Sequence, residues 1–168
     1  MNFKELFSGV KAFVFDVDGV MTDGMLVVLQ DELHRMMNIR DGYALHAAIH
    51  AGYPICVISG GKSESVRTRL NNLGITEVHL GVKDKPSILN EFLKAHDLNA
   101  TEVLYMGDDL PDLDVMRIVG VRCCPADAAP EIRAISLYIS PLAGGRGCVR
   151  DVIEQVMRLH GNWPGLNA

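Results

Sequence analysis

Short apolar runs alternate along this chain with longer segments that have the pattern of amphipathic helices. The clearest runs, rich in β-branched and aromatic residues, are Ala12–Phe15, Ile55–Ile58, Glu77–Leu80 and Val103–Met106, and weaker ones are Val121–Cys123 and Leu137–Ile139. Strands that alternate with helices form βαβ units, whose strands run parallel. Parallel strands are covered on both faces, which explains why the runs are continuously apolar. The sequence therefore predicts an α/β fold with a Rossmann-like, mostly parallel sheet flanked by helices.

The helical segments carry sequence signals for their ends. They are expected at Gly42–Ala51, Ser63–Leu73, Pro86–His96, Leu110–Val119 and Val149–His160. Gly52, Gly74 and Gly120 follow directly after three of them, and glycine commonly ends a helix. Ser63 and Asp41 are predicted as helix N-caps rather than catalytic groups, because their side chains can accept free backbone N–H groups.

One segment departs from this alternation. From Gly24 to Asn38, apolar residues alternate with others around a turn at Gln30-Asp31-Glu32, which indicates a β-hairpin inserted after the first strand. We call this hairpin, at about residues 20–38, the flap. Its apolar residues include Met25, Val27 and Leu29. Because so small a flap has little beneath it, these side chains are expected to form a subunit interface.

Length and composition limit the class of protein. The 168 residues contain no linker, so we expect a single domain, 1–168, ending in a glycine-rich segment at 143–168. Sixteen Lys and Arg against 21 Asp and Glu give a net charge of −5, which argues against nucleic-acid or membrane partners. No signal peptide or membrane-spanning run is indicated. The four cysteines have no C-x-x-C spacing, so we expect reduced thiols in the cytoplasm and buried packing for Cys123-Cys124.

Carboxylates follow two of the predicted strands. Ligands of open parallel sheets bind beyond the carboxyl ends of the strands, so the residues that follow each run are the candidates for chemistry. They are Asp16 and Asp18, Ser59-Gly60-Gly61, Gly107-Asp108-Asp109 with Asp112 and Asp114 behind, and Lys85 at the start of a helix. Converging carboxylates repel one another, and a cation that prefers oxygen ligands, Mg²⁺, relieves that repulsion. A hydroxyl and an ammonium beside it can bind phosphate oxygens.

Asp16 and Asp18 are suited to divided roles in phosphate-ester hydrolysis. If the backbone there is extended, side chains two residues apart face the same side. Asp16 can then attack phosphorus to form an aspartyl phosphate, which splits the slow reaction into two steps. Asp18 can protonate the leaving oxygen and afterwards take a proton from the attacking water.

These residues resemble the haloacid dehalogenase superfamily of phosphatases. Asp16-Val17-Asp18-Gly19-Val20, Ser59, Lys85 and Gly107-Asp108-Asp109 occur in the order of its four motifs, over nearly the whole chain. Aspartate at Asp18 is what phosphatases and mutases of the superfamily carry, whereas its transport ATPases have threonine there. The segments between the motifs are too short for the cap domain of many relatives, so the resemblance implies a capless phosphatase.

Within the superfamily, the chain is similar to the 3-deoxy-D-manno-octulosonate 8-phosphate phosphatases. The similarity rests on Asp18-Gly-Val-Met-Thr-Asp-Gly24, Arg40-Asp41-Gly42 and Gly144-Gly145-Arg146-Gly147. It implies lipopolysaccharide precursor synthesis and a homotetramer in which flaps pack together and a neighbouring subunit covers each site.

The resemblance also implies a role for each site residue. The Mg²⁺ ligands are Asp16, the backbone carbonyl of Asp18, and Asp108, with Asp109 and Asp112 supporting them. The phosphate-binding residues are Ser59, Gly60 and Lys85. The residues expected to meet the sugar acid are Lys62, Arg69 and Arg146.

Three alternatives differ in what they require. A signalling receiver domain also clusters carboxylates, but it accepts phosphate on an aspartate after its third strand, where this chain has Leu80-Gly81-Val82. A non-catalytic oligomerisation module would not need Asp16, Asp18, Lys85 and Asp108 together. A phosphatase for a nine-carbon, sialic-acid type keto-deoxy acid 9-phosphate has the same motifs, so the residues leave the length of the sugar open.

Overall fold

The computed structural model describes residues 3–30 and 32–165 of the chain. Its main sheet has six strands in the order β5-β4-β1-β6-β7-β8, and every neighbouring pair is parallel. The strands are β1 (Ala12–Phe15), β4 (Ile55–Ile58), β5 (Glu77–His79), β6 (Val103–Met106), β7 (Val121–Cys124) and β8 (Tyr138–Ile139). The predicted α/β fold with a mostly parallel sheet is therefore confirmed, and no cap domain lies within the described ranges.

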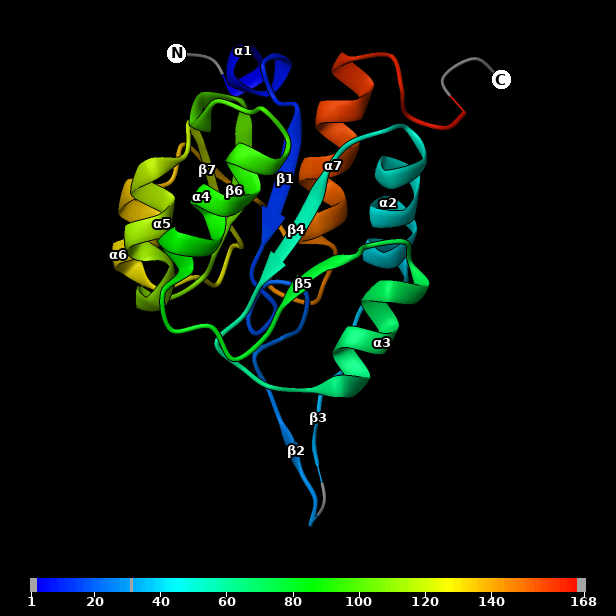
Figure 1. Ribbon diagram of the computed structural model, residues 1–168, viewed down its shortest axis with the longest axis vertical. Helices are drawn as coiled ribbons and strands as arrows, with labels where there is room; N and C mark the ends of the chain where they lie inside the picture. The colour runs from blue at the N-terminus through cyan, green and yellow to red at the C-terminus, as the bar shows by residue number, and fades with distance from the viewer. Residues whose placement is uncertain (1–2, 31, 166–168) are drawn as a thin grey trace.

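Helices cover both faces of this sheet (Figure 1). One face carries α1 (Phe3–Ser8), α2 (Ile39–His50), α3 (Glu64–Asn72) and α7 (Cys148–Leu159), and the other carries α4 (Lys85–Ala95), α5 (Leu113–Ile118) and α6 (Pro130–Ile135). Two short 3₁₀ helices are η1 (Ala100–Glu102) and η2 (Leu110–Asp112). Each face buries its own apolar cluster, so the central strands are sealed from water on both sides. In the part of the chain that the structure describes, no helix is long and apolar enough to cross a membrane.

The helix ends differ from the predictions where tertiary contacts decide them. The helix expected over 110–119 is divided into η2 and α5, with Pro111 inside η2. The N-cap of α3 is Ser63, as predicted, and it accepts the N–H of Val66. The prediction for Asp41 is wrong, because Asn38 caps α2. Asp41 lies in the first turn of α2 and accepts the N–H of Arg150 in α7 at 2.8 Å, so it caps a different helix.

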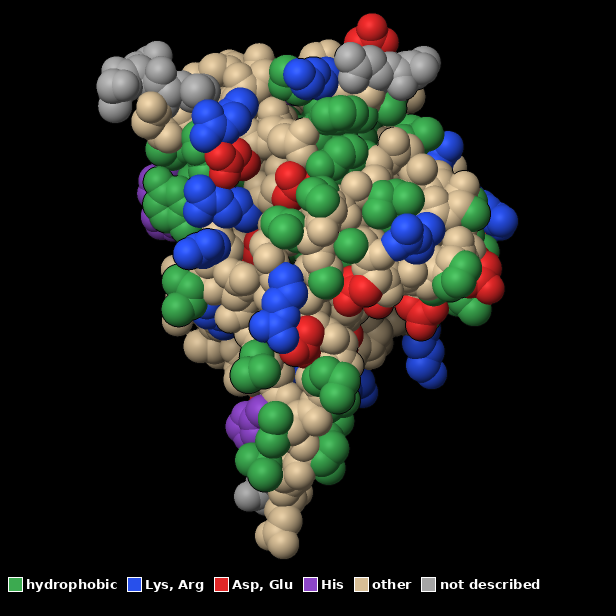
Figure 2. All heavy atoms as spheres, turned by 180° about the vertical axis from the view of Figure 1, so that it is seen from behind, with side chains coloured by type: hydrophobic (Ala, Val, Ile, Leu, Met, Phe, Trp, Pro, Cys, Tyr) green, Lys and Arg blue, Asp and Glu red, His purple; other side chains and the backbone are tan. Residues whose placement is uncertain are grey.

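The flap is a small antiparallel pair, β2 (Val27–Val28) and β3 (Leu33–His34). It projects beyond the carboxyl ends of β1 and β4 (Figure 1), and the tip residue Asp31 of the predicted turn lies outside the described residues. Figure 2 shows hydrophobic side chains gathered on this projection. The largest exposed ones there are Met25, Leu26, Val27, Val28, Leu29, Leu33 and Met36. The flap thus exposes the apolar surface that the sequence pattern predicted.

Candidate active site

A pocket of about 550 Å³ opens at the carboxyl ends of the central strands. The predicted residues that line it are Asp16, Asp18, Ser59, Gly60, Lys85, Asp108, Asp109 and Asp112. Residues from separate parts of the sequence meet there because β1 lies between β4 and β6 and all three strands end at the same edge. Lys83 also lines the pocket, although the sequence offered no motif that would have marked it.

Asp16 follows β1 directly and is buried at the floor of the pocket. Its Oδ1 accepts the N–H of Val17 at 2.7 Å and lies 3.2 Å from Nζ of Lys85. Burial and the negative charge of Asp112 raise the pKa of Asp16 to about 7, despite the opposing charge of Lys85. The site therefore has an excess of negative charge around this carboxylate, which a bound cation would relieve.

Asp112 and Lys85 form the buried anchor of the site. Oδ1 of Asp112 accepts Nζ of Lys85 at 2.7 Å and the hydroxyl of Tyr105 at 2.6 Å, and its Oδ2 accepts the N–H of Asp108 at 3.0 Å. Burial alone would lower the pKa of Lys85, but the carboxylates of Asp16 and Asp112 raise it, so the ammonium stays charged. Because protein donors occupy both oxygens of Asp112, its geometry suits the supporting role predicted for it.

Asp108 completes the acidic group. Burial first, and then the charges of Asp16 and Asp112, raise its pKa to about 8. Gly19 gives it room, since a Cβ at that position would lie 1.9 Å from Oδ2 of Asp108 and the backbone φ there is +82°. Carboxylate oxygens of Asp16, Asp108 and Asp112 lie within 4.8 Å of one another. These carboxylates offer only oxygen ligands, they repel one another, and Gly19 leaves space beside them. Such a site fits a hard divalent cation such as Mg²⁺.

Asp18 has a partner in the structure that no sequence pattern predicts. The chain turns after Asp16, with the N–H of Met21 donating to the carbonyl of Val17 at 2.9 Å, so the assumption of extended backbone is wrong although both aspartates line one pocket. Nε and Nη2 of Arg35 donate to the two carboxylate oxygens of Asp18 at 2.6 and 3.0 Å. Arg35 follows β3, so the flap supplies this residue. A single arginine in a hairpin carries no spacing signal that could have identified it.

Ser59 is held at the end of β4 by the neighbouring strand. Its N–H donates to the carbonyl of His79, its carbonyl accepts the N–H of Val82, both at 2.9 Å, and its Oγ accepts the N–H of Gly61 at 3.2 Å. A Cβ on Gly61 would lie 2.9 Å from Oδ2 of Asp18, so glycine lets this loop approach the acid. The hydroxyl is thereby fixed at the pocket beside Asp18.

Three predicted substrate-binding residues lie outside this pocket. Lys62 and Arg69 are exposed, and Arg69 lines a separate hollow beside Arg35. Arg146 reaches Asp23 at 3.5 Å and lines a groove along α7. Within the described chain the structure does not bring these cations to the phosphate site, so their role in substrate binding stays a prediction.

Known proteins resemble the chain over most of its length. The 3-deoxy-D-manno-octulosonate 8-phosphate phosphatase KdsC of Yersinia pestis is 34% identical over 151 residues, which are 89% of this chain and 81% of that protein. A crystal structure of the Yersinia pestis phosphatase matches with a TM-score of 0.93 and 32% identity, over 96% of this chain and 88% of that one. The corresponding phosphatase of Moraxella catarrhalis, solved with magnesium, phosphate and KDO, matches with a TM-score of 0.90 and 31% identity, over 95% and 92%. No family model matches.

The fold, the order of the site residues and these matches define a capless phosphatase of the haloacid dehalogenase superfamily. More narrowly, the chain belongs to the family of 3-deoxy-D-manno-octulosonate 8-phosphate phosphatases. The resemblance predicted from the motifs is therefore confirmed at both levels.

Proposed function

We propose that this protein is a Mg²⁺-dependent phosphatase that hydrolyses 3-deoxy-D-manno-octulosonate 8-phosphate to the sugar acid and phosphate, in lipopolysaccharide precursor synthesis. The observation that carries the proposal is the meeting of Asp16, Lys85 and Asp108 in one pocket, beside Asp18. The structure of the Moraxella catarrhalis relative supports the proposal, because it was solved with magnesium, phosphate and KDO.

Asp16 is the nucleophile and Asp18 is the acid and base. One carboxylate oxygen of Asp16 bonds to phosphorus as the ester P–O bond breaks, and Asp18 protonates the departing sugar oxygen. Water then attacks phosphorus, Asp18 takes its proton, and phosphate leaves Asp16. Arg35 holds the Asp18 carboxylate through two hydrogen bonds. It thereby fixes the position from which Asp18 donates and accepts the proton.

The remaining residues bind the phosphoryl group and the metal. The hydroxyl of Ser59, the backbone N–H of Gly60 and the ammonium of Lys85 would bind phosphate oxygens, since all three line the pocket. Asp16, the carbonyl of Asp18 and Asp108 would hold Mg²⁺, with Asp109 and Asp112 in support. The bound ion would neutralise charge on the transferring phosphoryl group.

The whole chain is one phosphatase domain in this proposal, and the flap joins its subunits. The apolar side chains on the flap are exposed in a single chain, and burying them against other flaps would form a homotetramer. Lys62, Arg69 or Arg146 of a neighbour would then meet the carboxylate of the sugar acid. A cytoplasmic location is consistent with the four buried free cysteines, Cys56, Cys123, Cys124 and Cys148.

Phosphate release from a substrate panel tests the proposal. The panel is 3-deoxy-D-manno-octulosonate 8-phosphate, a nine-carbon keto-deoxy acid 9-phosphate, simple sugar phosphates and p-nitrophenyl phosphate, each with Mg²⁺ and with EDTA. We expect Mg²⁺-dependent turnover that strongly favours the eight-carbon substrate, and none from Asp16→Asn. Preference for the nine-carbon compound would overturn the substrate assignment. Absence of phosphate release from every compound would overturn the proposed phosphatase activity.

Lys62→Ala and Arg69→Ala test the sugar-acid contacts. If these cations meet the substrate carboxylate, each variant loses selectivity for the sugar-acid phosphate over p-nitrophenyl phosphate. Unchanged selectivity would remove them from the site. Light scattering of the wild-type protein measures the subunit count separately, and a monomer would contradict the proposed tetramer.

A further inference from the structure

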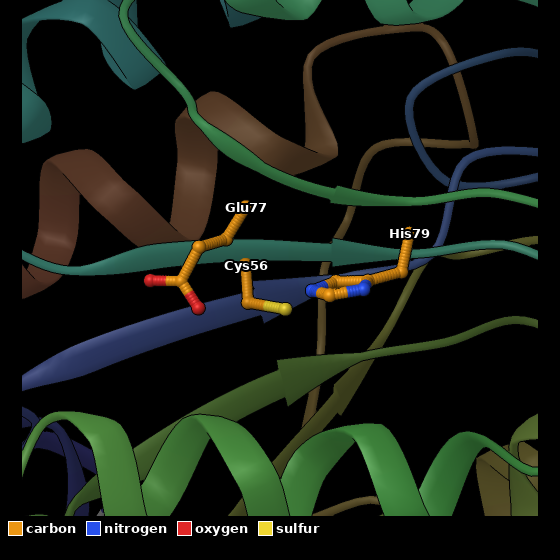
Figure 3. Close-up of side chains that lie close together, drawn as sticks. All are labelled: Cys56, Glu77 and His79. Atoms are coloured by element: carbon orange, nitrogen blue, oxygen red, sulfur yellow. The ribbon is translucent and has the colours of Figure 1, made fainter.

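A second group of metal-ligand side chains lies on the outer part of the sheet. The β4–β5 register places Cys56 opposite Glu77, and His79 follows Glu77 by two residues, so all three side chains project from one face. Figure 3 shows the Glu77 carboxylate and the His79 ring on either side of the Cys56 sulfur. One ligand atom from each residue lies within 4.8 Å of the others. Three different donor types thus converge at one point of the sheet.

Packing alone explains only part of this arrangement. Cys56 is fully buried in the apolar cluster beneath α4. An ordinary core cysteine could be buried in the same way. Glu77 is held by His96, the C-cap residue that follows α4, with Nε2 of His96 2.5 Å from Oε1 of Glu77. The ring of His79 forms no hydrogen bond with any residue that the structure describes, although it is half-buried beside a thiol and a carboxylate. The cluster therefore contains an imidazole donor that the fold leaves unused.

We propose that Cys56, Glu77 and His79 form a second metal site, which takes a transition-metal ion of the Zn²⁺ class. Thiolate, imidazole and carboxylate together are the usual ligands of Zn²⁺, whereas Mg²⁺ prefers oxygen alone. His96 acts as the outer partner that orients Glu77, as carboxylates and imidazoles beside metal ligands commonly do.

A metal ion can reach these three ligands from the sheet edge, and its binding requires Cys56 to lose a proton. β5 is the edge strand of the sheet, and Glu77 and His79 are partly exposed there, so an ion can enter from the edge. Burial raises the pKa of Cys56, so without metal its sulfur is a thiol. On binding, the S–H bond breaks, a sulfur–metal bond forms and the proton leaves to solvent.

This site is separate from the Mg²⁺ site but connected to it. None of its three ligands lines the active-site pocket. The carbonyl of His79, however, accepts the N–H of Ser59 at 2.9 Å. An ion bound to His79 would therefore stiffen the strand end that positions the phosphate-binding hydroxyl.

Cobalt titration of the metal-free, full-length protein tests the proposal. A thiolate bound to Co²⁺ gives a charge-transfer band in the near ultraviolet that carboxylate ligands alone do not give. We expect this band in the wild type and its displacement by Zn²⁺. We expect the same band in Asp108→Asn, which removes a ligand of the other site, and in Cys124→Ser, which changes a buried strand cysteine in the same apolar cluster.

Two variants decide whether the band arises at the proposed ligands. Cys56→Ser should abolish it, and the half-buried His79→Gln, which disturbs the core less, should weaken Zn²⁺ binding by more than about 100-fold, since even outer partners contribute about 10 to 100-fold. Circular dichroism confirms that each variant is folded. Absence of the band in the folded wild type, its persistence in Cys56→Ser, or unchanged Zn²⁺ affinity in His79→Gln would each overturn the site.

Discussion

The sheet edge and the flap supply the two halves of the proposed catalytic machinery in contrasting ways. At the sheet edge, Lys85 is 4% exposed and Asp112 is 1% exposed, and each is paired inside the core. At the flap, the side chain of Arg35 is 5% exposed but follows a hairpin whose tip residues, such as Val28 at 74%, face outward, and its partner Asp18, in the turn after β1, has a side chain that is 36% exposed. The buried half is fixed by the fold of one chain. The half that contains Asp18 depends on how the flap places Arg35, which would link the proposed acid and base to the proposed assembly.

The largest expected effect belongs to the buried half. Asp16→Asn removes the proposed nucleophile, so turnover should fall by about 10⁴-fold or more. The raised pKa of Asp16 means that its charge is unfavourable in the folded state, so the variant should be at least as stable as the wild type. Phosphate release and thermal unfolding in EDTA measure the two effects. A loss of stability together with activity would show that Asp16 serves the fold as well.

Lys85 should contribute most to stability. Lys85→Met leaves Asp16 and Asp112 buried without their ammonium, and breaking a buried pair in this way costs about 3–5 kcal/mol. Urea unfolding in EDTA measures it. Lys83→Met is the matched control, because Lys83 lines the same pocket but is exposed. Recovery of most of the loss in Lys85→Met/Asp112→Asn would attribute it to the unpaired charge, whereas equal stability of Lys85→Met and wild type would contradict the buried anchor.

The contrast between the two halves also separates what the sequence predicts from what it does not. Strand ends follow from apolar runs and motif order, so the amino-acid sequence alone assigns Asp16, Ser59 and Asp108 to one edge of the sheet. It does not assign Arg35, because the contact of Arg35 with Asp18 depends on how a hairpin of two-residue strands folds back. The N-cap prediction for Asp41 is wrong for a related reason, since this carboxylate caps a helix more than one hundred residues away.

Arg35 should affect catalysis more than folding. Arg35→Met frees the Asp18 carboxylate, and misplacing a catalytic group by about 1 Å costs about 100-fold in rate. kcat should therefore fall by about 10 to 100-fold on a sugar phosphate, with little change in KM. The fall should be smaller on p-nitrophenyl phosphate, whose leaving group needs little protonation.

A double-mutant cycle sharpens this prediction. If Arg35 acts only through Asp18, then Arg35→Met should have no further effect on kcat in an Asp18→Asn background. Additive losses would instead indicate that Arg35 contacts the substrate directly. An equal loss on both substrates would contradict a role in positioning the acid.

The smallest effect on folding is expected at the tip of the flap. Val28→Lys places a charge on an exposed side chain, so the unfolding free energy of a single chain should change by about 0.5 kcal/mol or less. If flaps form the interface, the same change should dissociate the assembly, because an ammonium would be buried in an apolar contact.

Leu159→Lys, at an exposed leucine that ends α7, is the matched control and should leave the assembly intact. Light scattering measures both variants. If the Val28→Lys protein dissociates and its kcat falls, assembly is connected to the Arg35–Asp18 pair, since nothing at the buried sheet edge has changed. An intact assembly would instead show that the apolar side chains of the flap do not form the interface.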